Sequence, residues 1–173
     1  MKKLSIAVAI FALVACGGEA KKTETKKVET TPEVMKEVVE EVIEEELEKE
    51  LVEINVAATG ESMAEIAFEP KGISVPEDSR VRLVFENKSS AEGMLHNFVL
   101  VELGSGAEIA MAGIKAGAEN NFVPKDDRVI AYTAVSNMGE TLTIEFDAPA
   151  KGSYHYVCTY PGHTSMIGRL NVE

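Results

Sequence analysis

Short runs in which apolar side chains alternate with polar ones begin near residue 52 and continue to the C-terminus. A period of two places the apolar side chains on one face of a β-strand. The alternating residues are Val52, Ile54, Val56; Ile66, Phe68; Val81, Leu83, Phe85; Leu142, Ile144, Phe146; Tyr154, Tyr156, Cys158; and Leu170, Val172. Turn residues separate these runs at 70–72, 76–78, 87–89, 137–139 and 149–152. Short strands at this spacing predict an antiparallel all-β sandwich or barrel over residues 52–173.

One segment interrupts the strand pattern. Residues 105–120 are rich in Ala and Gly, and carry Ile109, Met111 and Ile114 at helical spacing. We expect a small helical insertion between two strands. The whole chain of 173 residues is long enough for one domain with its own core plus appendages.

The N-terminus has the pattern of an export signal. Lys2 and Lys3 precede an apolar run, residues 4–15, which is too short to span a bilayer. The run ends in Leu-Val-Ala-Cys16, which resembles a bacterial lipoprotein signal, with residues 1–15 removed and Cys16 acylated. The alternative is an ordinary signal peptide with an incidental cysteine. Acylation predicts a protein anchored in the cell envelope, facing the periplasm or the exterior, and Gly17 favours the outer membrane.

Two further segments precede the predicted domain. Residues 16–31 contain few apolar side chains, so we expect a flexible tether. Residues 32–51 begin with Thr31-Pro32 and carry apolar residues at spacings of three and four, which predicts a helix. This helix has nine glutamates against two lysines between residues 33 and 50. Such dense like charge favours a solvated spacer over the alternative, a short coiled coil or partner-docking helix.

The net charge limits the class of partner. The chain carries 17 basic and 29 acidic residues, a formal charge of −12. Phosphate backbones would repel such a chain, so we expect no nucleic-acid binding. The charge is compatible with basic protein partners.

Residues 158–166, Cys-Thr-Tyr-Pro-Gly-His-Thr-Ser-Met, place a thiolate, an imidazole and a thioether on one short stretch. A second imidazole is available at His96. Two imidazoles, one thiolate and a weak axial thioether suit copper that cycles between two oxidation states. Zinc also accepts such nitrogen and sulfur ligands, but a structural zinc site takes four strong ones. The pattern therefore predicts a copper site with Cys158 at a strand end and His96 at the opening of another strand.

At these residues the chain resembles the cupredoxins, the type 1 blue copper proteins, and is most similar to the auracyanin and azurin group. The matching motifs are His96-Asn-Phe-Val-Leu100, Phe122-Val-Pro124, and the run from Gly152 through His163. The resemblance covers about residues 60–173. It implies a Greek-key sandwich with one mononuclear copper and equatorial ligands His96, Cys158 and His163. It also implies that Asn97 braces the cysteine-bearing loop by hydrogen bonding.

The resemblance further implies Met166 as the axial ligand, although only Thr164 and Ser165 separate it from His163, fewer than the family usually has. Met138 or the backbone carbonyl of Leu95 stays open as an alternative near the axis. Two other candidates are set aside. His155 is expected on the face of its strand opposite to the Cys158 sulfur, and Met111 is expected in the core.

The expected function is single-electron transfer by a membrane-tethered blue copper protein, not an enzyme, between redox partners such as cytochromes or other respiratory or photosynthetic components. The imidazole edge of His163 is the expected electron port, with Met94, Leu95, Pro161 and Met166 around it as a docking patch. The alternative is a copper carrier or chaperone that exchanges metal rather than electrons. A copper oxidase or nitrite reductase would need further His-rich sites, and this chain has three histidines in all.

Overall fold

The computed structural model describes residues 49–173. The predicted signal peptide, Cys16, the tether and nearly all of the predicted spacer helix lie outside the described residues. Residue 51, the last of that predicted helix, is instead the first residue of strand β1 (Leu51–Thr59). Within the described part, no helix is both long enough and apolar enough to cross a bilayer.

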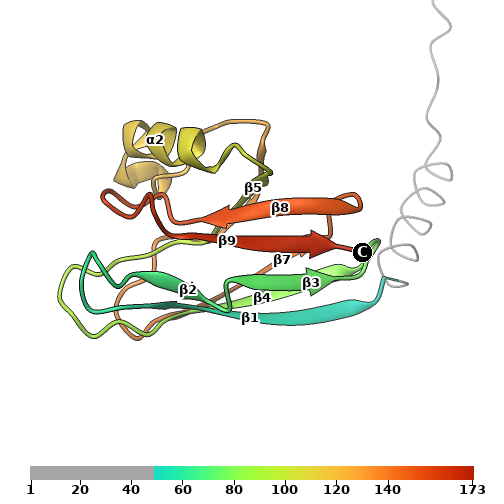
Figure 1. Cartoon of the computed structure of the whole chain (residues 1–173), viewed down its shortest axis with the longest axis horizontal. Helices are drawn as coiled ribbons and strands as arrows, with labels where there is room; N and C mark the ends of the chain where they lie inside the picture. Colours follow the sequence, from blue (N-terminus) through green and yellow to red (C-terminus); the bar gives the residue numbers. More distant parts are fainter. Residues whose placement is uncertain (1–48) are drawn as a thin grey trace, which may run out of the picture. The chain divides into compact units, whose positions relative to one another are not determined.

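Two β-sheets pack face to face (Figure 1). The first has the order β2-β1-β4-β7 and the second β3-β9-β8-β5-β6. The remaining strands are β2 (Ala67–Glu69), β3 (Gly72–Val75), β4 (Arg80–Asn87), β5 (Val99–Glu102), β6 (Val129–Tyr132), β7 (Thr141–Asp147), β8 (Gly152–Val157) and β9 (Ile167–Val172). The predicted all-β sandwich is confirmed.

The sheets are mixed, so the expectation of purely antiparallel pairing is wrong. β1 pairs with β4 in parallel, from Leu51 opposite Arg80 to Ala58 opposite Asn87. β3 pairs with β9 in parallel as well. The other pairs of neighbouring strands are antiparallel. Parallel neighbours cannot be joined by a hairpin, and in both cases the chain visits other strands between the two partners.

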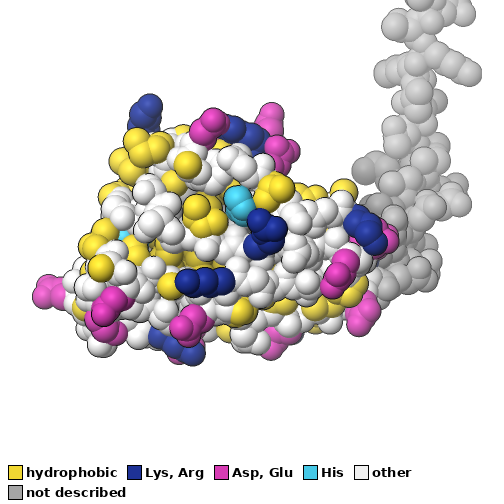
Figure 2. All heavy atoms as spheres, in the orientation of Figure 1, with side chains coloured by type: hydrophobic (Ala, Val, Ile, Leu, Met, Phe, Trp, Pro, Cys, Tyr) yellow, Lys and Arg dark blue, Asp and Glu magenta, His cyan; other side chains and the backbone are white. Residues whose placement is uncertain are grey.

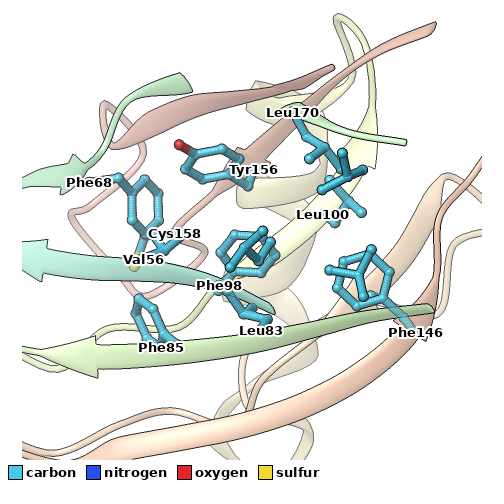
Figure 3. Close-up of a cluster of buried hydrophobic side chains, with 14 of the residues drawn as sticks. Val56, Phe68, Leu83, Phe85, Phe98, Leu100, Phe146, Tyr156, Cys158 and Leu170 are labelled. Carbon is cyan, nitrogen blue, oxygen red and sulfur yellow. The ribbon is translucent and has the colours of Figure 1, made fainter. Parts of the chain in front are cut away.

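The core lies between the sheets and follows the predicted alternation. In β4 every second residue is buried, which points Val81, Leu83 and Phe85 inward. Phe68, Phe85, Phe98 and Tyr156 meet there with ring centroids 5.1–6.3 Å apart. Figure 3 shows this cluster, and Cys158 belongs to it. The Cys158 thiol is thus part of the hydrophobic core between the two sheets.

The predicted helical insertion is present as helix α2 (Gly106–Ala116), followed by a 3₁₀ turn, η1 (Ala118–Asn120). The helix covers the outer face of the second sheet. Its residue Ile109 packs with Val99, Val101 and Val157 in a second buried cluster. Because both faces of β5 are covered, Val99, Leu100 and Val101 are all buried and show no alternation.

Charged side chains are paired on the outer face of the first sheet. Arg80 contacts Asp147 at 3.0 Å and Arg82 contacts Glu145 at 2.9 Å, both across the β4–β7 pair. On the face drawn in Figure 2, basic side chains are scattered among acidic and hydrophobic ones, with no continuous basic stripe.

Candidate metal centre

His96 is fixed by a backbone bridge rather than by a strand. Its N–H donates to the Ser136 carbonyl at 3.3 Å, and its carbonyl accepts from the Ser136 N–H at 2.7 Å and from Oγ at 2.9 Å. The expectation that His96 opens a strand is therefore wrong, since β5 begins three residues later at Val99. The imidazole is fully buried at the end of the sandwich.

Asn87 supports the approach to His96, a role that the sequence pattern did not indicate. Its buried Nδ2 donates to the carbonyls of Met94 at 2.8 Å and Ser136 at 3.3 Å. Its Oδ1 accepts from the N–H of Ser89 at 3.1 Å. One amide thus joins the segment before His96 to the segment that His96 pairs with.

The loop of residues 158–166, the ligand loop, is closed by its own backbone. The N–H of His163 donates to the Tyr160 carbonyl at 3.0 Å, and that of Met166 donates to the His163 carbonyl at 2.9 Å. The N–H of Cys158 donates to the Met166 carbonyl at 3.2 Å, which returns the chain to β9. Gly162 makes the turn possible because its φ of 89° lies in the left-handed region, where residues with a β-carbon are strained.

Three donor atoms converge at this end of the domain. The Nδ1 atoms of His96 and His163 are 3.1 Å apart, and the Cys158 Sγ lies 3.9 and 3.7 Å from them. A point equidistant from all three lies about 2.1 Å from each, within the range of about 2.0–2.3 Å that His nitrogen and Cys sulfur take to a metal such as zinc. The cluster fits one metal ion with trigonal donors, as a copper electron-transfer site requires.

Burial sets the protonation of these donors. Desolvation, and to a lesser extent the neighbouring His163, lower the pKa of His96 to about 4. Desolvation also lowers the pKa of His163 and raises that of the Cys158 thiol to about 11. Both imidazoles are therefore neutral at pH 7 and keep a lone pair for a metal. The other ring nitrogen of His96, Nε2, is buried and has no hydrogen-bond partner among the described residues.

Asn97 lies where the resemblance implied, between the two ligand-bearing segments. Its Nδ2 donates to the Thr159 Oγ1 at 2.8 Å and to the Asn121 carbonyl at 2.9 Å, and its Oδ1 accepts from the Thr159 N–H. Thr159 and Asn121 are site residues that no local sequence signal indicated. The brace therefore includes a third segment, the turn after α2.

The candidate axial groups differ in position. Met166 is 1% exposed and packs in the same buried cluster as Cys158, whereas the alternative, Met138, is 45% exposed. Because Met166 is buried, it does not contribute to the surface of the expected docking patch. Met111 is 56% exposed on α2, so its expected place in the core is wrong. His155 is half-buried and lies near Gly106 of α2, on the face opposite to the sulfur, as expected.

The expected electron port is covered. His163 is 1% exposed, although Pro161 and Gly162 beside it are exposed. The ring of Tyr160 lies 5.1 Å from the imidazole, and Phe122 packs edge-on against Tyr160 at 5.3 Å. Other side chains therefore stand between His163 and solvent.

Residues 52–173 match the family model of copper binding proteins of the plastocyanin/azurin family. The chain is 38% identical over 126 residues to auracyanin-A from Chloroflexus aurantiacus, covering 70% of this chain and 75% of that protein. It is also 38% identical over 123 residues to azurin iso-2 from a Methylomonas species, covering 66% and 93%.

Solved structures show the same similarity. The solved structure of auracyanin A, described as a "blue" copper protein, aligns with a TM-score of 0.65 at 37% identity, covering 71% of this chain and 99% of that one. Reduced auracyanin from Roseiflexus castenholzii aligns with a TM-score of 0.62 at 34% identity, covering 70% and 96%.

Proposed function

This chain belongs to the plastocyanin/azurin family of copper-binding proteins, and from that premise we propose that it carries single electrons between redox partners in the bacterial envelope. The family consists of blue copper electron carriers that bind one copper ion. A bound copper supplies a one-electron couple between Cu(I) and Cu(II). We assign His96, Cys158 and His163 as its equatorial ligands and Met166 as its axial ligand.

The observation that carries the proposal is the buried triangle of donors on a braced framework. The edges of 3.1, 3.7 and 3.9 Å already suit a trigonal metal, so the donors need little movement on binding. His96 is held by Ser136, and Cys158 follows directly on β8. Fixed donors favour electron transfer, because the ligands of both oxidation states can then stay in nearly one arrangement.

The same features disfavour the alternative, a copper carrier that exchanges metal. His96, Cys158 and His163 are each at most 1% exposed. A partner protein could reach these donors only after the ligand loop had moved. Exchange sites depend on open donors, whereas electron transfer needs only close approach. We propose no enzymatic reaction for the chain.

The partners that we propose are redox proteins that dock weakly at the ligand-loop end of the domain. Pro161 is exposed there, and Met94 and Leu95 are half-buried. The formal charge of −12 favours partners with a basic surface, such as cytochromes.

Absorption and EPR spectra of the copper-loaded protein test the function. We expect an intense visible band from Cys158 thiolate-to-copper charge transfer, which C158A abolishes. H96A and H163A should change the spectrum, while H155A, the matched control outside the cluster, should leave it unchanged. A colourless copper complex after full oxidation would rule out the electron carrier.

We propose that lipid chains on Cys16 tether the protein to a membrane, as the pattern before Cys16 suggests. The wild-type chain expressed in a bacterium should sediment with membranes and incorporate labelled fatty acid. C16S should do neither. A wild-type chain that is fully released into the soluble fraction would contradict the tether, without bearing on the copper site.

A further inference from the structure

The turn between β1 and β2, residues 60–66, lies against the ligand loop. A β-carbon placed on Gly162 would lie 2.7 Å from the Cε and 3.9 Å from the Sδ of Met63, and apart from Pro161 and His163 no other described residue would lie within 4 Å of it. Met63 is itself 49% exposed. Its thioether group therefore has solvent on one side and the residue next to His163 on the other.

The turn that carries Met63 is internally fixed. The N–H groups of Glu65 and Ile66 both donate to the Ser62 carbonyl, at 2.9 and 3.2 Å. The Ser62 Oγ donates to the Glu65 carboxylate at 3.0 Å. These bonds close one turn around Met63, which fixes the backbone that carries it.

The turn is also clamped to the segment that leads to His96. The Glu61 carboxylate accepts from the Ser90 N–H at 3.0 and 3.1 Å and from the Ser90 Oγ at 3.1 Å. The Ser89 Oγ donates to the Gly60 carbonyl at 2.7 Å. Two neighbouring serines thus hold two neighbouring residues of the turn.

We propose that Met63 is a positioning residue that shields His163 from water and small solutes, and that the Glu61–Ser90 clamp holds it in place. Together with Tyr160, the shield accounts for the 1% exposure of His163, which directly follows the exposed Pro161 and Gly162. The largely apolar side chain of methionine excludes water, to which its sulfur offers only a weak acceptor. As far as it concerns copper, this inference rests on the proposed function. The cover itself is a property of the folded chain.

Acylation of histidine by diethyl pyrocarbonate tests the shield in metal-free protein. Mass spectrometry after timed exposure of the full chain reads His163 and His155 separately by fragment ions. We expect M63A to raise the acylation rate of His163 by about tenfold or more, because a group protected by cover reacts when the cover is removed. His155, outside the cluster, is the internal control and should not change.

Two variants are matched controls. M63L keeps an apolar side chain of similar size and should keep the wild-type rate at His163. M111A removes a methionine of similar exposure, 56%, from α2 and should also leave that rate unchanged. Acylation of His163 in M63A at the wild-type rate would overturn the shield, whether or not the protein carries copper.

A second variant tests the clamp. E61A leaves Met63 in the chain but removes the acceptor for Ser90, so we expect an acylation rate of His163 between those of wild type and M63A. If His163 is acylated in E61A at the wild-type rate, the proposed clamp is wrong. The result for M63A alone then decides whether Met63 is a shield.

Copper-loaded protein gives an independent readout. The rate at which EDTA removes copper, followed by loss of the visible band, should rise in M63A and stay near wild type in M63L. Equal rates in all three chains would overturn a role for Met63 at the metal. A wild type that takes up copper without a visible band would instead contradict the proposed function.

Discussion

Asn97 and Thr159 are joined by two hydrogen bonds that run in opposite directions. The Asn97 Nδ2 donates to the Thr159 Oγ1 at 2.8 Å, and its Oδ1 accepts from the Thr159 N–H at 2.9 Å. Each residue directly follows a proposed ligand, His96 in one case and Cys158 in the other. The pair therefore fixes the separation of two segments that are 62 residues apart in the chain.

Removing this brace should destabilise the metal-free domain. N97A leaves the buried Thr159 N–H and Oγ1 without their partner, and an unsatisfied buried group costs about 1–3 kcal/mol. Urea unfolding should show a loss of free energy of unfolding in this range. N120A is the control, because the exposed Nδ2 of Asn120 makes one bond, to the Ala116 carbonyl. Equal losses in the two variants would contradict the brace.

The axial assignment is tested by M166Q. An amide oxygen is a harder donor than a thioether and favours Cu(II) over Cu(I). We expect the reduction potential to fall by at least about 59 mV, which is a tenfold change in a one-electron equilibrium. Voltammetry checks this, with M138Q as the matched control at the exposed methionine. A potential that stays at the wild-type value in M166Q would remove Met166 from the axial position.

A glycine in β9 allows the packing of a core aromatic residue. A β-carbon on Gly168 would overlap the ring of Tyr156, which is fully buried and donates its hydroxyl to the Pro70 carbonyl at 2.6 Å. G168A should lower the free energy of unfolding by about 1–3 kcal/mol through overpacking. G72A in the neighbouring strand β3 is the control, since nothing lies within 4 Å of a β-carbon there. Thermal unfolding of both variants separates the two cases.

The Asp126–Arg128 pair predicts a pH-dependent contribution to stability. Hydrogen bonds from the Arg128 side chain, at 2.9 and 2.8 Å, lower the pKa of Asp126 from 3.8 to about 2. A carboxyl with a depressed pKa stabilises the fold above its unfolded pKa and loses that contribution as pH falls through its folded pKa.

D126N should therefore unfold at a lower temperature than wild type at pH 7, and the difference should shrink between pH 3.8 and about 2. Because the pair is only half-buried and solvent reaches it, added salt should also reduce the difference. D127N changes the neighbouring exposed carboxyl and is the control. A difference between wild type and D126N that is unaffected by pH would contradict the contribution of the charged pair.

The sequence predicted the strands in which apolar and polar side chains alternate regularly, but it did not indicate β3 or β6. The sequence of β4 shows the alternation, because Arg80 and Arg82 face solvent while Val81 faces the core. β5 shows no alternation, because α2 covers its outer face and leaves a short continuous apolar run, so its predicted start at His96 was three residues early. The parallel pairing of β1 with β4 depends on the order of the sheet, which alternation does not report.

The residues of the candidate site also include some that the sequence predicted and some that it did not. Cys158 and His163 were predictable from their donor atoms and their short spacing. His96 was predictable as the second imidazole that such a site needs. Ser136 and Asn87 were missed, because each acts through backbone hydrogen bonds to residues distant in the chain. The cover over His163 was missed too, since no sequence rule places a turn at residue 63 over a loop a hundred residues later.

The length of β1 has a consequence for orientation. Nine residues at about 3.3 Å each span roughly 30 Å, from Leu51 to the turn beside the ligand loop. Figure 1 shows the start of β1 and the C-terminus at the same end of the sandwich, away from that turn. The tether that we propose through Cys16 would therefore join the domain at the end opposite to the proposed copper site. With such a tether, a redox partner would dock at the ligand loop without contacting the point of attachment.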